Sequence, residues 1–523
     1  MIDGTGRPAL RDAVVLIDGP RIAVVGKRSE IDIPSDAQVI DASGRTVVPG
    51  LIDSHTHFLS MGYRLGHLQL DDAESIGDIV GRLGEYIRAR GLPRGKWAQG
   101  RGWDDQNLAE RRYPDRRDLD ESSPDNPVAL TRICGHMIVL NSRALEACGI
   151  KRDTPNPPGG VIDKDACGEP TGVLRDARGI VTPHIPPPTY EELRHGLRDA
   201  IELAHSLGAT TIHDCSRPDE SSLLMSVKPY VDAHGEGDMR LRCHVMTGNP
   251  RERSGDEWLS FGTMKIGIDG SMGAQTALLY EPYANDPSTS GVYVGDQERN
   301  RRVAGEQHGN GGQIAIHAIG DRAITEAVNR IEEVLAKTPR ADHRHRIEHF
   351  EYPTDADIKR ARRLGIVASM QPNFVGEWAW HGGMYETRLG EERNRRSNPY
   401  RRLLDLGFHV PFGSDGMPFH PLYGIWSAVN HPMPGSRISV EEAVRCYTLE
   451  GAYATREEDI KGSIEPGKLA DVTILPIDIT KPEFHLATTD PTIVEKTKRK
   501  LKNTKAYMTI LNGNVVYQAK DVR

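Results

Sequence analysis

Cysteine is scarce in this sequence, and long apolar runs are absent. The six cysteines among 523 residues form no C-x-x-C pair and no zinc-finger spacing, which excludes a disulfide scaffold and a cysteine-based metal module. No segment approaches the roughly 18 apolar residues of a membrane-spanning helix. Asp3 and Asp12 stand where a signal peptide would carry its apolar core. We therefore expect reduced thiols, a cytoplasmic protein and no membrane partner.

A surplus of one charge is missing as well. Lysine and arginine number 66 against 74 aspartate and glutamate, a net charge of -8 with both signs scattered along the chain. This balance argues against nucleic acid or an anionic membrane as a partner. A small-molecule substrate is the better expectation, and we expect the chain to form a homodimer.

The two ends of the chain share a strand-and-turn texture. Short β-type runs occupy 13–17 and 22–26, and similar runs return at 470–475 and 508–517 around a hairpin turn. The sequence therefore predicts that residues 1–46 and 462–523 form one composite β-sandwich.

Between the ends lie apolar runs that end in polar residues and are mostly followed by helical patterns, the texture of parallel βα units. The eight candidate strands are 47–57, 209–215, 241–247, 263–269, 313–317, 345–349, 366–371 and 409–414. A helix over 322–336 repeats apolar residues with helical spacing. Eight such units over 47–461 predict an α/β fold, a (β/α)8 TIM barrel.

The first two candidate strands are separated by about 150 residues, far more than a usual βα connection. This gap must hold an inserted subdomain at 60–205. Because the insert follows the first strand, it emerges on the catalytic rim of the predicted barrel, and we expect it to roof the active site.

His55 and His57 follow the first apolar strand. Residues two apart in a strand point to the same side, so both imidazoles can reach one metal. The alternative is that two histidines fall two apart by chance. The position favours the metal, since TIM barrels keep their chemistry where the strands emerge.

Later strands deliver further ligand types at the same end, namely His317, His349 and Asp415. Each has an ordinary alternative: His317 as a core histidine, His349 paired with Glu348, and Asp415 capping a helix. Four strands that contribute ligands at one rim are hard to obtain by accident. Three or more imidazoles suit zinc or a similar divalent ion better than calcium or magnesium.

These motifs resemble the amidohydrolase superfamily, in particular the branch that contains N-substituted formamide deformylase. The matching strings in the strands are VPGLIDSHTH (48–57), KIGIDGS (265–271), HAIGDRA (317–323), RIEH (346–349) and GSD (413–415). Further matches lie in the insert, NSRAL (141–145) and GEPTG (168–172), and near the end, GSIEPGKLAD (462–471). The resemblance covers nearly the whole chain.

The resemblance implies a binuclear metal centre of one or two divalent ions. One metal would be bound by His55, His57 and Asp415 and a second by His317 and His349, with a carbamate on Lys265 as the bridge. Lys265 is the single lysine in an apolar strand, and a buried amine tends to lose its proton, after which it can add CO2. The alternative from the residues alone is a snorkelling lysine or one paired with Asp269.

Three further residues are candidates for substrate binding. His136 in the insert would polarise a substrate carbonyl and so also count as catalytic, or it is a packed histidine. Trp103 would line the pocket, or it is a core aromatic. Arg322 would touch substrate, or it pairs structurally with Asp321.

The predicted function is a metal-dependent hydrolase that cleaves a non-peptide amide or another C–N bond by a metal-activated hydroxide. Asp415 would take the proton of the hydroxide and deliver it to the leaving nitrogen. Alternatives on the same site are an ester or lactone hydrolase, a cyclic imide hydrolase and a deaminase. A non-catalytic scaffold is an alternative of another class, against which the complete ligand set counts.

Overall fold

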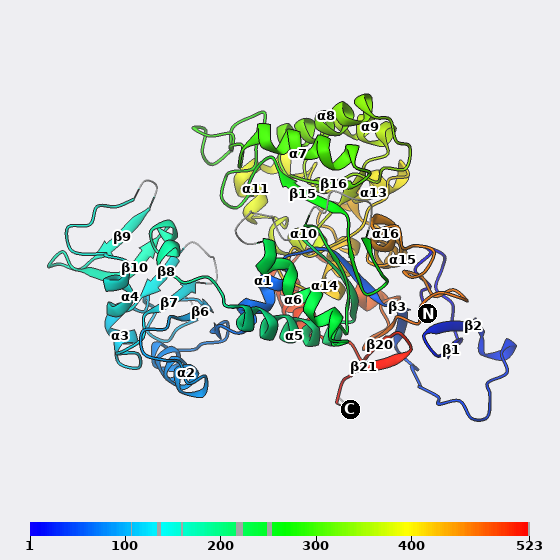
Figure 1. Ribbon diagram of the computed structural model, residues 1–523, viewed down its shortest axis with the longest axis horizontal. Helices are drawn as coiled ribbons and strands as arrows, with labels where there is room; N and C mark the ends of the chain where they lie inside the picture. The colour runs from blue at the N-terminus through cyan, green and yellow to red at the C-terminus, as the bar shows by residue number, and fades with distance from the viewer. Residues whose placement is uncertain (106, 133–136, 158–159, 216–222, 248–253, 521–523) are drawn as a thin grey trace. The chain divides into compact units, whose positions relative to one another are not determined.

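The computed structural model describes residues 1–105, 107–132, 137–157, 160–215, 223–247 and 254–520. The chain divides into two compact units (Figure 1): unit 1 comprises Met1–Leu59 and Ala200–Arg523, and unit 2 comprises Ser60–Asp199. Unit 2 covers most of the predicted insert, and the division falls inside helix α5 (Tyr190–Ser206). No helix within the described ranges is long and apolar enough to cross a membrane.

Unit 1 contains a five-stranded sheet in the order β13-β14-β12-β11-β4. Its strands are β4 (Leu51–Thr56), β11 (Ala209–Asp214), β12 (Arg242–Val245), β13 (Ser254–Gly255) and β14 (Leu259–Phe261). β11 pairs in parallel with β4 and β12, and β12 pairs in parallel with β14. Every residue of β4 and β11 is buried, as expected for parallel strands that are covered on both faces.

A second sheet of unit 1 contains four consecutive parallel strands. They are β15 (Thr263–Gly267), β16 (Gln313–Ala318), β17 (Arg346–His349) and β18 (Val367–Ser369). The helices that connect them are α7 (Gln297–Gly309), α8 (Asp321–Lys337) and α9 (Asp355–Leu364), and α7 and α8 lie beside β15 and β16 in Figure 1. The predicted helix at 322–336 is α8, which buries Ile324, Val328 and Ile331.

One isolated bridge joins these two sheets, and another extends the second sheet. Thr247, after β12, bridges Met264 of β15 in antiparallel fashion, and Met370, after β18, bridges Phe412 in parallel. The structure therefore has the expected α/β architecture with parallel strands in two hydrogen-bonded sheets. Closure of these sheets into one eight-stranded barrel stays a prediction.

The predicted eighth strand, 409–414, is not a regular strand among the described residues. The backbone amide of Ser54 donates to the carbonyl of Phe412 (3.0 Å), but the amide of Phe412 donates to Cys446 (2.9 Å) rather than to a strand. The segment also bonds to the strand before it: the amides of Ala368 and Met370 donate to the carbonyls of His409 and Pro411 (3.0 Å each), and that of Gly413 donates to Met370 (2.9 Å). These bonds lie on both sides of the segment but do not make it a regular strand. The strand prediction was therefore wrong in detail, although the segment runs where it was expected.

The predicted first strand, 47–57, is two strands. β3 (Thr46–Pro49) pairs antiparallel with a strand from the far end of the chain, and β4 enters the parallel sheet. Gly50 lies between them, where an added Cβ would come within 2.1 Å of Thr210 Oγ1. Only glycine permits this close approach, and the chain changes sheets here.

The two ends of the chain meet in a four-stranded sheet of order β21-β20-β19-β3. Beside β3 it contains β19 (Val472–Leu475), β20 (Met508–Leu511) and β21 (Asn514–Gln518), and a separate hairpin is formed by β1 (Ala13–Asp18) and β2 (Arg21–Lys27). Ile22 of the hairpin shares an apolar cluster with Val472, Ile474 and Met508 of the sheet. The two ends of the chain therefore form one β structure. It includes β3 and so extends beyond the predicted boundary at residue 46.

Unit 2 is built on a six-stranded sheet of order β5-β6-β7-β8-β10-β9. Its strands are β5 (Leu68–Gln69), β6 (Ala98–Trp103), β7 (Val128–Arg132), β8 (Met137–Leu140), β9 (Val161–Lys164) and β10 (Pro170–Arg175), and its helices include α2 (Ile76–Ala89), α3 (Arg116–Asp120) and α4 (Ser142–Ala147). Val128 and Leu130 pack in the α2 cluster, whereas Ala129 packs in the α4 cluster. Alternate residues of β7 thus fill two cores on opposite faces of the sheet.

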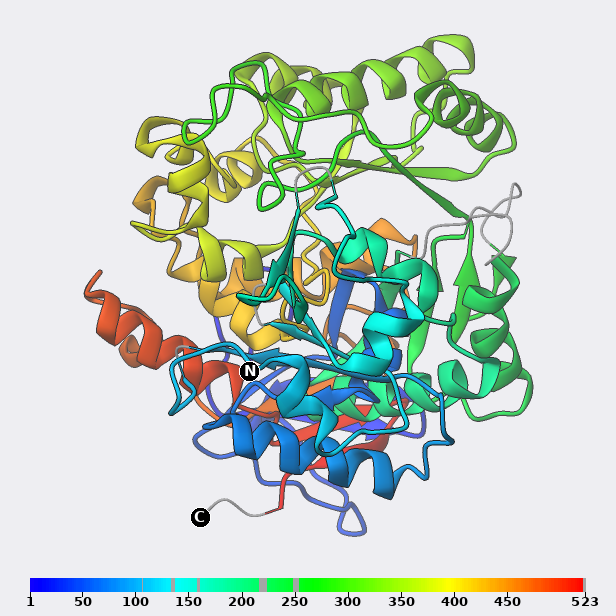
Figure 2. The same ribbon diagram turned by 90° about the vertical axis from the view of Figure 1, so that its left-hand side faces the viewer.

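The remaining helices are short. Helix α1 (Phe58–Leu65) spans the division between the units, and unit 1 contains α6 (Leu223–Gly235), α10 (Pro372–Trp378), α11 (Met384–Leu389), α12 (Glu391–Asn394), α13 (Tyr400–Asp405), α14 (Pro421–Val429), α15 (Val440–Cys446), α16 (Leu449–Ala454) and α17 (Pro491–Lys502). Single 3-10 turns occupy 28–30, 178–180, 182–184, 434–436 and 482–484. Figure 2 shows α17 in orange-red at the edge of unit 1, where Val494 and Leu501 are buried.

Candidate metal centre

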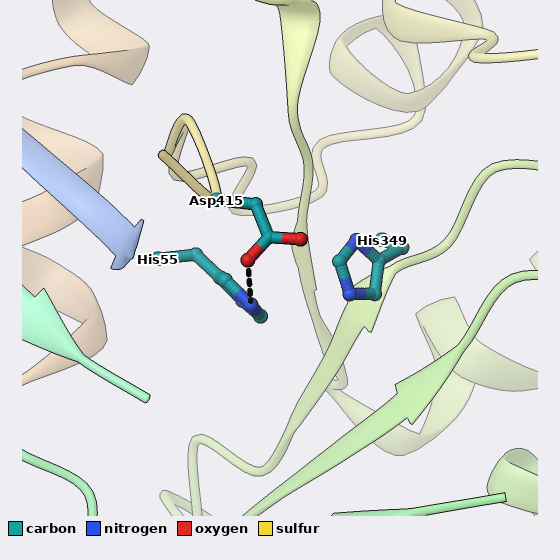
Figure 3. Close-up of side chains that lie close together, drawn as sticks. All are labelled: His55, His349 and Asp415. Carbon is teal, nitrogen blue, oxygen red and sulfur yellow. Dashed lines mark ion pairs between the residues drawn. The ribbon is translucent and has the colours of Figure 1, made fainter. Parts of the chain in front are cut away.

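Three predicted ligands come together at the carboxyl ends of separate chain segments. His55 is the penultimate residue of β4, His349 ends β17 and Asp415 follows the segment beside β18. One ligand atom from each lies within 4.8 Å of the other two, and Figure 3 shows the three side chains converging. The group draws one histidine from each of the two metal positions that the resemblance implies.

Glu348 fixes the orientation of the His55 ring. Nδ1 of His55 lies 2.5 Å from Oε2 of Glu348, and both side chains are buried. Because a carboxylate can only accept here, Nδ1 carries the proton and Nε2 keeps its lone pair. The free lone pair faces the site, where the amine of Lys265 lies 3.2 Å away.

A buried arginine holds Glu348 in turn. Arg346 Nη2 donates to Glu348 Oε2 (3.1 Å) and to the carbonyl of Ser54 (2.7 Å). Its Nε lies 2.7 Å from Glu348 Oε1, close enough for an ion pair although not aligned as a hydrogen bond. This pair was not predicted from the sequence. Its signal there is Arg346-Ile347-Glu348, because two opposite charges on the same side of a buried strand are stable only when they pair.

His349 is presented in a strained backbone conformation. Its φ is +77°, in the left-handed region that ordinary residues avoid, at a cost of about 1–3 kcal/mol. Its ring stacks on Phe374 with centroids 5.9 Å apart. Its buried Nδ1 has no hydrogen-bond partner among the described residues.

The two buried histidines are held in the form that binds metal. Burial lowers the pKa of His55 well below its ordinary value. Burial likewise lowers the pKa of His349, with His317 as the next cause. Both imidazoles are therefore neutral at pH 7, as metal coordination requires.

Asp415 is held against β4 by its backbone. Its amide donates to the carbonyl of His55 (2.7 Å), and its φ is +54°. Gly413 permits this approach, because an added Cβ there would lie 2.4 Å from the amide nitrogen of His55. Helix α14 begins later and is capped by His420, so Asp415 is not the helix cap of the alternative interpretation.

His57 lies on the open side of Asp415. Its Nε2 is 3.4 Å from Asp415 Oδ1, and its side chain is 34% exposed, whereas that of His55 is fully buried. The same carboxylate oxygen is 3.7 Å from Nε2 of His55. The predicted trio of His55, His57 and Asp415 is therefore brought together around one oxygen.

Lys265 is buried beside His55, with 4% of its surface exposed. Within the described residues it forms no ion pair with Asp269, whose carboxylate accepts instead from the backbone amides of Leu278, Ile319 and Gly320. Burial raises the pKa of Asp269 to about 7. The lysine is thus placed toward the ligand group.

His317 is near the group but turned toward a loop. Its Nε2 lies 2.9 Å from the carbonyl of Gly270 and 3.5 Å from Asp269 Oδ1. Its ring centroid is 4.3 Å from that of His349. The structure therefore puts His317 next to one ligand without bringing its nitrogen into the three-residue cluster.

The donor set fits a divalent metal. Around a four-coordinate zinc with bonds of about 2.1 Å, ligand atoms lie about 3.4 Å apart, and the separations within 4.8 Å among His55, His349 and Asp415 are near this range. Neutral imidazoles and a carboxylate suit zinc and similar ions. His57 and Lys265 stand close enough to complete such a site.

Comparison with known proteins decides the family. The sequence profile of the amidohydrolase family matches residues 38–517, which includes all the predicted ligands. The chain belongs to the amidohydrolase family.

Relatives of this amidohydrolase span almost its whole length. It is 34% identical over 504 residues to YtcJ of Bacillus subtilis, with 92% of this chain and 91% of that protein covered. It is 28% identical over 522 residues to the N-substituted formamide deformylase of Arthrobacter pascens, covering 90% and 91% of the two chains. The crystal structure of an uncharacterized metal-dependent hydrolase from Pyrococcus furiosus superposes with a TM-score of 0.70 at 29% identity, covering 89% of this chain and 95% of that one.

The family shown by the comparison is the one that the motifs resemble, and the solved structural neighbour is a metal-dependent hydrolase. The branch predicted from the motifs is confirmed, since N-substituted formamide deformylase is among the relatives.

Of the three predicted substrate residues of the amidohydrolase, Trp103 and Arg322 lie within the described residues. His136 lies outside the described residues. Trp103 is fully buried in the α2 core of unit 2, and its indole donates to the carbonyl of Leu130 (3.1 Å). Trp103 is therefore a core aromatic rather than a pocket residue, because a fully packed ring whose N–H is hydrogen-bonded has no surface left for a ligand.

Arg322 is exposed at the start of α8, and its guanidinium lies over the ring of Tyr293, 5.7 Å from the centroid. Within the described residues it forms no ion pair with Asp321, whose carboxylate accepts from the amide of Tyr280 (2.9 Å). The two residues pair instead through the backbone amide of Arg322, which donates to Asp321 Oδ1 (2.9 Å). A contact of the Arg322 guanidinium with substrate stays a prediction.

Proposed function

We propose that this amidohydrolase cleaves a non-peptide amide or another C–N bond of a small molecule, using one or two divalent ions of zinc or a similar metal. The observation that carries the proposal is the convergence of His55, His349 and Asp415, from three separate segments, within 4.8 Å. The relationship to a formamide deformylase supports the choice of a C–N bond. A non-catalytic scaffold would have no need to keep strained ligands in place.

Six residues would hold the metal: His55, His57, Lys265, His317, His349 and Asp415. When bound, the metal supplies Lewis acidity toward the substrate carbonyl and activates a water as nucleophile. In this proposal the segment after β18 and the two parallel sheets form a closed (β/α)8 barrel, whose rim carries all six side chains. The strand ends already described support that arrangement.

Asp415 is the proton carrier of the proposed reaction. Its Oδ1 lies 3.4 Å from Nε2 of His57 and 3.7 Å from Nε2 of His55, so it would adjoin a water held by a metal at these ligands. The carboxylate takes a proton from the water as the new C–O bond forms, and it delivers that proton to the leaving nitrogen as the C–N bond breaks. His136 is proposed to polarise the substrate carbonyl.

Lys265 is proposed to carry a carbamate that bridges two metal positions. Its burial supports this, because an unpaired ammonium is costly to bury whereas a neutral amine can add CO2. The 3.2 Å contact of its Nζ with Nε2 of His55 supports it too. The carbamate would be an anion with two oxygens, suited to lie between two cations.

Specificity is proposed to lie partly in the insert, because the chain enters it directly after His57 and loops carry specificity on a shared fold. A panel of N-formyl, N-acyl and cyclic amides, with matched esters and lactones, tests the proposed function. We expect turnover on C–N substrates in preference to esters. Turnover of esters or lactones alone would replace the proposal with the alternative on the same site.

A further inference from the structure

Gln371, which directly precedes helix α10, is a buried glutamine whose side chain has no partner within the part of the chain that the structure describes. Gln371 is 1% exposed, and neither Nε2 nor Oε1 of its carboxamide has a hydrogen-bond partner among the described residues. A buried amide without partners is unfavourable, so native proteins seldom keep one unless something else completes it. Both Nε2 and Oε1 of Gln371 are therefore available to a ligand.

The strand register places Gln371 at the catalytic edge. Glu348 pairs with Ser369 in the parallel ladder of β17 and β18, and Ser369 Oγ accepts from Arg346 (2.9 Å), the arginine that holds Glu348. Gln371 is two residues further on, directly after Met370, which continues the strand pairing through a parallel bridge to Phe412. It therefore lies on the same side of the strand as Ser369, one step closer to the edge that bears the ligands.

The residues after Gln371 are tied to both ligand segments. Phe374 stacks on the ring of His349. Asn373 Nδ2 donates to the carbonyl of Pro418 (2.7 Å), in the loop that follows Asp415. The start of α10 thus stands between His349 and the Asp415 loop, and it holds Gln371 there.

We propose that Gln371 binds the substrate through its amide edge. Nε2 donates to a carbonyl oxygen of the substrate and Oε1 accepts from a substrate N–H, so the carboxamide is complementary to an edge that offers C=O and N–H side by side. Primary amides, lactams and cyclic imides have such an edge. Esters and lactones lack the N–H, and a trans secondary amide points its two groups to opposite sides.

This inference rests on the proposed function and narrows it. A site built to accept a hydrogen bond from an N–H discriminates strongly against an analogue without one, because its own acceptor is then buried unpaired. Among the alternatives left open by the sequence, Gln371 favours C–N substrates with a free N–H and disfavours esters and lactones.

Three six-membered rings test the proposal: glutarimide, N-methylglutarimide and δ-valerolactone. We would measure kcat/KM for ring opening by the zinc-loaded wild type and by Gln371→Met, which keeps the length of the side chain but not its hydrogen bonds. We expect Gln371→Met to lose about 10- to 100-fold on glutarimide and little on the other two rings. Zinc content should stay unchanged.

Gln313 provides the matched control. It is a glutamine of unit 1 whose Nε2 is already bonded to the carbonyls of Arg344 and Ala454, at the opposite end of the strands. Gln313→Met should lower thermal stability without changing the preference among the three rings. An equal loss by Gln371→Met on all three rings, or no loss on glutarimide, would overturn the proposal.

Binding provides a readout apart from turnover. Calorimetric titration of the chelator-treated wild type with glutarimide should give tighter binding than titration with N-methylglutarimide, and Gln371→Met should remove the difference. Equal binding of the two imides by the wild type would overturn the role of Gln371. Failure of the zinc-loaded enzyme to open any amide, with the binding difference intact, would contradict the proposed function alone.

Discussion

Nδ1 of His55 and Oε2 of Glu348 lie 2.5 Å apart, with both side chains buried. The contact joins a predicted metal ligand on β4 to a carboxylate on β17 that is not itself a predicted ligand. Carboxylate partners of this kind set the tautomer of a ligating histidine and raise its basicity. The metal centre thus depends on a residue that would not itself touch the metal.

The first prediction concerns Glu348→Gln. The amide can turn its NH2 group toward His55, and it leaves the guanidinium of Arg346 without a counter-charge. We expect zinc affinity to fall about 10- to 100-fold, as measured by competition with a chromophoric chelator.

Glu457→Gln is the control for Glu348→Gln, because Glu457 is a buried glutamate whose ion pair with Lys461 (2.9 Å) involves no residue of the candidate centre. It should lower stability and leave zinc affinity unchanged. Wild-type zinc affinity in Glu348→Gln, with stability lowered as in the control, would reduce Glu348 to a structural role.

The second prediction concerns Asp415→Asn. An asparagine keeps the shape of the side chain but cannot carry a proton, so kcat should fall by about 10²- to 10⁴-fold while the fold is retained. Steady-state kinetics, with circular dichroism to check folding, measures this. Near-normal turnover would transfer the proton-carrying role to another residue, with His136 the next candidate.

The third prediction concerns the carbamate on Lys265. Protein equilibrated with ¹³C-bicarbonate should show a carbamate carbonyl signal by NMR that Lys265→Ala lacks. The variant should also lose zinc and activity, and short carboxylates such as formate should restore part of both. An unmodified amine in a fully metal-loaded, active enzyme would refute the bridge and leave a single metal position.

The fourth prediction concerns Trp103→Ala. Because the indole is fully buried in unit 2, its removal should destabilise that unit by about 3–5 kcal/mol, measured by chemical denaturation. Tyr113→Ala, which removes the 39% exposed ring beside Trp103, should cost much less. Altered KM with undiminished stability in Trp103→Ala would restore the pocket interpretation.

Local patterns in the sequence predicted most of the elements that position the centre. The alternation of side chains along a strand predicted that His55 and His57 point to the same side. The apolar runs predicted β11, β16 and β17 close to their observed bounds. These features depend only on residues that are neighbours in the sequence, because side chains along a strand alternate between its two faces.

Features that depend on distant segments could not be predicted in this way. Whether Glu348 pairs with His349 or with His55 is decided by how β17 meets β4, and the sequence offered the first as an alternative. The left-handed backbone of His349 and Asp415 is stabilised by tertiary contacts that override local preference. Position 50, between β3 and β4, requires glycine because a side chain there would collide with Thr210, which lies 160 residues further along the chain.

Reconstitution with zinc tests the central claim most directly. Wild-type protein would be stripped by a chelator and titrated with zinc, while hydrolysis of the best amide in the panel is followed. The account predicts that the stripped protein is inactive and that activity rises with bound zinc to a plateau at one or two ions per chain. Full activity in the stripped protein would contradict it.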